Sequence, residues 1–137
     1  SRFGSAADDY DLYIVDSGGS LVATSDDPQD GNDDPLEYAQ VTNSSSSAEV
    51  FYAVVDLYSG SPRRFNIRYD RNIADLGFKT PFGSIGGHQT ALGAITVATI
   101  NAQDSGNDTL AYYSSQGPCD VFYPTPVRRA KSAVRYA

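Results

Sequence analysis

The sequence predicts a mostly β protein, an antiparallel β-sandwich or jelly roll followed by a shorter segment of different texture. Three observations indicate this class. The 137 residues are 40% hydrophobic and 12% aromatic, which is typical of a globular chain. Short apolar runs alternate with period 2 between turns rich in Gly, Pro, Asn and Ser. No long run has the 3.6-residue period of a helix.

The first two strands are expected to form a hairpin. Residues 8–15 alternate apolar and polar side chains, which predicts a half-buried strand. Asp16-Ser17-Gly18-Gly19 supplies the turn, since glycine adopts positive φ without steric cost. Residues 20–24 then return as the second strand.

Three further strands are expected before residue 70. Residues 36–41 are expected to form the third strand, and residues 65–69 alternate like the first strand. Residues 48–57 are apolar on both faces, so this segment is expected to be the central and most buried strand. Five strands joined by turn residues favour a sandwich or jelly roll.

The sequence pattern changes after about residue 70, and a boundary near residue 78 is expected to divide the chain into domains at 1–78 and 79–137. The second part contains a Gly-rich loop at 80–87 and a short apolar run at 94–100, typical of a buried strand. Residues 109–114 predict one more strand. This second part is too short to bury a core well by itself.

Charge and cysteine content exclude some functions. The net charge of −7 argues against nucleic acid, whose binding requires clustered Lys and Arg. Four basic residues lie within the last ten positions and are expected to form a solvated end. No apolar run is long enough to span a membrane. The single Cys119 cannot form an internal disulfide and is expected to be a packed residue.

An acidic loop is the one candidate site that the residues alone indicate. Its carboxylate and amide oxygens are the hard ligands that Ca²⁺ prefers, and Gly31 permits a sharp bend. The alternative is a solvated acidic loop that keeps the protein soluble. The candidate calcium ligands are Asp26, Asp27, Asp30, Asn32 and Asp33, which Asp8, Asp9 and Asp11 would join if their strand end lay alongside.

Two stretches resemble the subtilisin-like serine proteases. They are 84–100, SIGGHQTALGAITVATI, and 110–118, LAYYSSQGP, of which the Ser-Ser-x-Gly-Pro part is the most specific. The first sixty-odd residues resemble the β-sandwich inserts of some large subtilases, which are similar to pre-peptidase C-terminal modules. Asp9-Tyr10-Asp11-Leu12-Tyr13-Ile14 is the matching signature.

The resemblance implies a non-catalytic segment of a secreted subtilisin-like endopeptidase. The family's catalytic Asp, His and Ser would lie outside this chain, so His88, Ser114 and Ser115 are expected to be structural and the chain inactive alone. The implied partners are the remainder of the catalytic domain and a protein or polysaccharide substrate. The acidic composition agrees with secretion. The alternative is a free-standing β-sandwich module for binding or adhesion.

Overall fold

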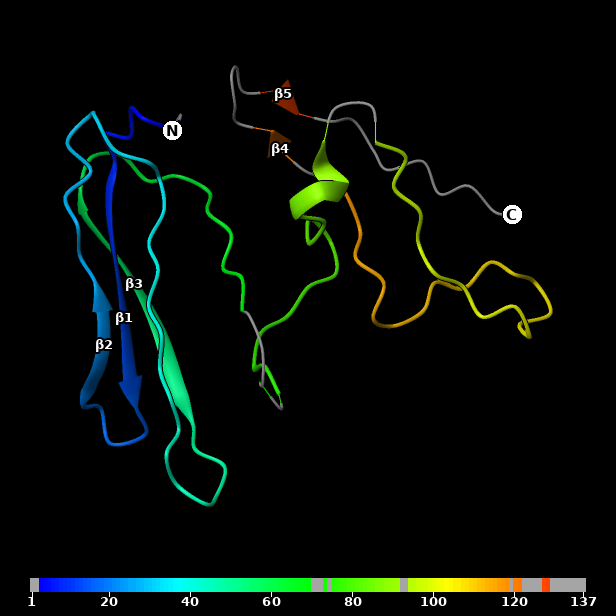
Figure 1. Cartoon of the computed structure of the whole chain (residues 1–137), viewed down its shortest axis with the longest axis horizontal. Coiled ribbons are helices and arrows are strands. Elements are labelled where there is room, and N and C mark those ends of the chain that lie inside the picture. Colours follow the sequence, from blue (N-terminus) through cyan, green and yellow to red (C-terminus); the bar gives the residue numbers. More distant parts are fainter. Residues whose placement is uncertain are drawn as a thin grey trace. The chain divides into compact units, whose positions relative to one another are not determined.

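A three-stranded antiparallel sheet organises the first half of the chain (Figure 1). The computed structural model describes residues 3–69, 73, 75–91, 94–118, 120–121 and 127–128. Strands β1 (Asp9–Asp16), β2 (Leu21–Ser25) and β3 (Phe51–Ser59) form this sheet in the order β2-β1-β3. The prediction of a mostly β protein is therefore confirmed at the level of one antiparallel sheet.

The β1–β2 hairpin follows from its turn residues. The side-chain Oδ1 of Asp16 accepts hydrogen bonds from the N–H groups of Gly18 and Ser20, at 2.8 and 2.9 Å. Gly19 lies in the left-handed region at φ +82°. An aspartate that caps its own turn and a glycine free to adopt positive φ are the features that predicted the hairpin.

The prediction that residues 48–57 form the central and most buried strand is wrong. Strand β1, which pairs with both neighbours, is the central strand, whereas β3 lies at the sheet edge. Along β3, residues 51, 53, 55 and 57 are half-buried and the alternate residues are exposed. An apolar pattern on both faces identifies a strand but does not say which neighbours pair with it.

Two predicted strands are extended segments without a strand ladder. In residues 36–41, exposure still alternates, with Glu37, Ala39 and Val41 half-buried. This segment contacts β2 through a side chain, because the Tyr38 N–H donates to Ser25 Oγ at 3.1 Å. Residues 65–69 are exposed, and the Phe65 ring lies 5.8 Å from that of Tyr10.

The second half of the chain has few regular elements among its described residues. They are the 3₁₀ turn η1 (Gly87–Thr90) and the short antiparallel pair β4 (Asp120–Val121) and β5 (Val127–Arg128). Ile85 is buried, and its carbonyl accepts a 3.0 Å hydrogen bond from Arg68 Nη2. The expected strands at 94–100 and 109–114 are reduced to one bridge, Ile100 with Leu110.

The chain divides by its internal contacts into two units, Ser1–Ile67 and Arg68–Ala137. Their junction lies before the boundary expected at residue 78, and the assignment of 1–78 and 79–137 to separate domains stays a prediction. No helix among the described residues has the length and apolar character that crossing a bilayer demands.

Candidate functional site

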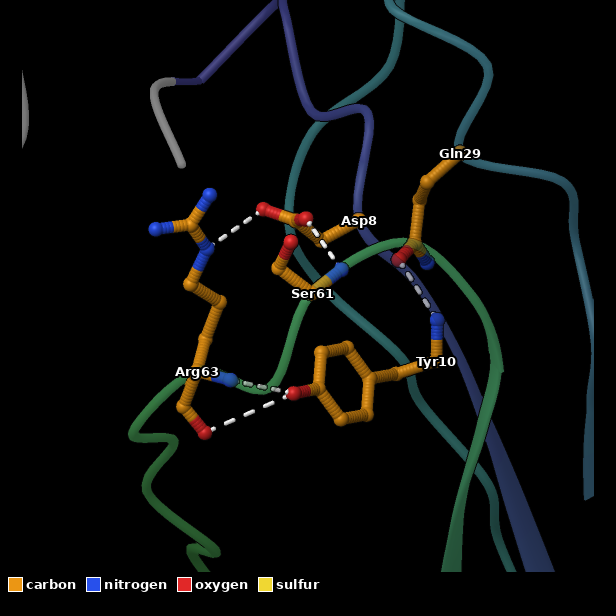
Figure 2. A network of polar contacts seen from close by, with 5 residues as sticks. All are labelled: Asp8, Tyr10, Gln29, Ser61 and Arg63. Atoms are coloured by element: carbon orange, nitrogen blue, oxygen red, sulfur yellow. Dashed lines mark hydrogen bonds and ion pairs between the residues drawn. The ribbon is translucent and has the colours of Figure 1, made fainter.

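A polar network holds the start of β1 against the turn that follows β3 (Figure 2). Asp8 accepts hydrogen bonds from the Ser61 N–H at 2.9 Å and from Arg63 Nε at 2.6 Å. The Tyr10 hydroxyl accepts the Arg63 N–H at 2.5 Å. The side chains of Asp8, just before β1, and of Tyr10 in β1 therefore bind backbone N–H groups 53 positions away, which closes the sheet at this end.

Glycine at position 60 is required for this closure. Gly60 has φ +104°, and a Cβ built there would lie 2.9 Å from the Asp8 Cα and 2.8 Å from its Oδ1. The backbone of the turn therefore passes directly beside Asp8, where no side chain fits.

A second group of polar side chains lies around two buried carboxylates of β1, Asp9 and Asp11. Asp9 Oδ1 accepts the Gln29 N–H at 3.2 Å, and Asp11 Oδ2 accepts the Tyr13 hydroxyl at 2.7 Å. Gln29 is also buried, and its Oε1 accepts the Tyr10 N–H at 3.1 Å. The bond to Asp11 is the largest cause that raises the pKa of Tyr13 to about 12.

Glu37 joins this group from the segment after the acidic loop. Its carboxylate accepts hydrogen bonds from Ser25 Oγ and Gln29 Nε2. Burial is the largest cause that raises the Glu37 pKa; the Ser25 bond opposes it, and the negative charges of Asp27, Asp11 and Asp9 add to it. The negative charge of an ionised Glu37 is therefore electrostatically unfavourable among these carboxylates.

We expect Glu37→Gln to raise the melting temperature at pH 7 and to lose this advantage in acid. A raised folded pKa means that the neutral form stabilises the fold. That contribution is present below the usual pKa near 4.5 and is lost as the pH rises through the folded value. Thermal melts from pH 4 to pH 8 measure it. Glu49→Gln removes the same charge at an exposed position and is the control; equal curves for the two variants would contradict this account.

The expected calcium ligands are placed along the loop but are not gathered together. Asp33 is half-buried; the other four, Asp26, Asp27, Asp30 and Asn32, are exposed. The loop is fastened to the N-terminal segment, since the Ala6 N–H donates to the Asp33 carbonyl at 2.9 Å and the Gly31 N–H to the Ala6 carbonyl. Among the described residues, no three acidic, histidine or cysteine side chains lie close enough to hold a metal ion.

The strand end of β1 does lie beside the loop, as the bond between Gln29 and Asp9 shows. The residues that sequence reasoning missed are Gln29 and Glu37. The signal for Glu37 is a lone carboxylate at an alternating position of an otherwise uncharged segment, 36–41. Gln29 has no such signal, because its partners lie far away in the chain.

The residues considered for catalysis have structural surroundings. Ser114 is buried, and its hydroxyl oxygen accepts the Thr99 N–H at 3.2 Å. His88 is an exposed residue of η1, and its carbonyl oxygen accepts the Ala91 N–H at 3.2 Å. Ser115 is exposed, and Cys119 lies outside the described residues.

Comparison with models of protein families, with curated proteins and with solved structures finds no match to this chain.

Proposed function

We propose that this chain is a non-catalytic segment of a secreted subtilisin-like serine endopeptidase. Its β-rich N-terminal unit serves stability or the binding of a protein or polysaccharide substrate. Its second unit contributes strands to a catalytic domain that further polypeptide completes. The proposal rests on the residue resemblance together with one observation in the second unit, the state of residues 94–100.

Residues 94–100 have the geometry of a strand that lacks neighbours. Exposure alternates along the segment, and the side chains of Ile95 and Val97 are 88% and 76% exposed. Among the described residues, backbone hydrogen bonds of the segment occur at its two ends: the Ala94 N–H donates to the Ala91 carbonyl at 3.1 Å, and the Ala111 N–H donates to the Thr99 carbonyl at 2.8 Å. Among the described residues, the backbone groups of 95–98 have no hydrogen-bond partner.

An apolar strand of this kind is stable only where other strands cover it. Burial of an Ile or Val side chain contributes about 1.5–3 kcal/mol, and unpaired backbone groups are costly once buried. The remainder of the catalytic domain is the partner that the resemblance implies. The buried, hydrogen-bonded Ser114 is the first residue of the Ser-Ser-x-Gly-Pro motif and supports a structural role for that motif.

The sandwich architecture belongs to the same proposal. The second layer would be built from the extended segments 36–41 and 65–69. Support comes from the alternating exposure of the first segment and from the ring contact between Phe65 and Tyr10 of β1.

The alternative is a free-standing β-sandwich module for binding or adhesion. The observation that favours it is the row of exposed apolar side chains on β3, with Tyr52 and Tyr58 54% and 73% exposed. Contiguous exposed apolar surface of this kind marks interaction sites.

Calcium remains part of the proposal as a ligand of the acidic loop. A metal that binds only the folded chain stabilises it by about 2.7 kcal/mol at a hundredfold excess over its Kd. We therefore expect the melting temperature to rise with Ca²⁺ and to fall with chelator. The Asp30→Ala, Asp33→Ala double variant should lose this response. An unchanged melting curve for the parent chain across the titration would remove calcium from the account.

Amide hydrogen exchange tests the main proposal. The amides of residues 95–98 are expected to exchange freely in the isolated chain, while those of β1 are protected. Addition of the missing polypeptide should then protect the 95–98 segment.

A further inference from the structure

The outer face of β3 carries a continuous row of exposed side chains. Residues two apart in a regular strand share a face, so Tyr52, Val54 and Asp56 point the same way, and Tyr58 is exposed at the register shift that follows them. Val54 is 45% exposed, and Val50, just before the strand, continues the row. The row is apolar and aromatic, with one carboxylate at Asp56.

The outer edge of β3 is also open. The strand pairs with β1 along its whole length. Among the residues that the structure describes, its backbone forms no other hydrogen bond. Every second residue of such an edge strand directs its N–H and C=O outward, and these groups can pair with another strand.

The other edge of the sheet is less suitable. Strand β2 has five residues against nine in β3, while both pairings of β1 contain one register shift, between Ile14 and Val15 on the β2 side and between Asp9 and Tyr10 on the β3 side. Ser25, the last residue of β2, also accepts a hydrogen bond from the Tyr38 N–H through its Oγ. Short strands are one of the features by which sheets discourage edge pairing, so the length of β3 makes it the better edge.

The charge of the N-terminal unit, residues 1–67, determines what kind of added strand would bind at the edge of β3. Residues 1–67 contain ten Asp and two Glu against three Arg, a net charge of −9. Asp56 lies directly opposite Asp11 in the β1–β3 pair. Like charges directly opposite destabilise a sheet, so a cation on the far side of Asp56 would offset an unfavourable pair.

We propose that β3 binds an extended, cationic peptide segment as an added edge strand. This inference rests on the binding role proposed for the N-terminal unit. Main-chain hydrogen bonds supply the pairing, and alternate side chains of the peptide lie against the exposed row. Its Lys or Arg residues pair with Asp56 and lie over the rings of Tyr52 and Tyr58. A second copy of the N-terminal unit is a poor occupant, because it brings the same net charge of −9 to the interface.

The test uses the full chain and a peptide of alternating Lys and Val as long as β3. A Glu–Val peptide of equal length is the control. At saturation with the Lys–Val peptide, alternate amides of β3 are expected to exchange about tenfold more slowly, while those of β2 do not change. The Glu–Val peptide should produce no protection.

Substitution at Asp56 sharpens the test. Asp56→Lys is expected to weaken binding of the Lys–Val peptide by about threefold to tenfold, since it replaces an attraction with a repulsion. Thr24→Lys places the same side chain at an exposed position of β2 and should change the affinity little. Protection of β1 amides in each variant verifies that the sheet is intact.

Several results would overturn the inference. They are absence of binding, equal binding of both peptides, and binding without protection of β3. Protection of β3 that increases with protein concentration in the absence of peptide would instead identify a second copy as the occupant. Exchange at residues 95–98 of the free chain is independent of these outcomes, so failure here leaves the proposed function standing.

Discussion

Gly60→Ala is expected to destabilise the N-terminal unit by about 2–4 kcal/mol, from backbone strain and overpacking of similar size. Gly60 has φ +104°, a region that alanine rarely adopts, and its Cβ would meet backbone as well as side-chain atoms of Asp8. Relief of the overlap would displace Asp8 from the Ser61 N–H and from Arg63. Urea unfolding followed by far-UV circular dichroism measures the change.

Gly19→Ala is the matched control for this variant. Gly19 also has a positive φ, +82°, but a Cβ there would have no atom within 4 Å. It should therefore cost about 1–2 kcal/mol from strain alone. Equal losses of stability for the two variants would show that the approach of the turn to Asp8 contributes nothing, which contradicts the network of Figure 2.

The sequence predicts the local features of this fold better than its pairing. The β1–β2 hairpin is correctly predicted because Asp16 and Gly19 act within their own turn. Strand β3 is correctly recognised as a strand but wrongly placed at the centre of the sheet. Alternation records which side chains share a face, whereas the position of a strand in a sheet depends on residues far away in the chain.

The same distinction applies to the candidate site. The acidic loop was visible as a cluster of carboxylates, and its residues are mostly exposed. The group around Asp9 and Glu37 was not predicted, because it depends on hydrogen bonds between residues up to twenty positions apart. Gln29 is a buried glutamine that links strand β1 to the segment 36–41, and no local pattern in the sequence indicates this.

The extended segment 36–41 shows that a strand can be predicted from the sequence without its pairing partner. Its exposure alternates in the structure, with Glu37, Ala39 and Val41 half-buried, yet its backbone forms no ladder among the described residues. Extended geometry follows from the pattern, but a ladder also requires a neighbour in register. The segment 94–100 shows the same limit in the second unit.

The second large effect is expected in hydrogen exchange, between residues 95–98 and strand β1. Amides of β1 are held between two strands and should open only with the whole unit. Amides of 95–98 have no backbone partner among the described residues, so their protection factors should be about 1. At a global stability of about 5 kcal/mol, the two groups would differ by more than a thousandfold.

The comparison of amide exchange at residues 95–98 and in β1 tests most directly the claim that the second unit pairs with strands of further polypeptide. It is made by NMR on a sample verified as monomeric, because pairing between copies would protect an open strand. The account predicts free exchange at 95–98 and strong protection in β1. Equal, strong protection in both would mean that the chain buries and pairs its strands unaided, and would contradict the proposed function.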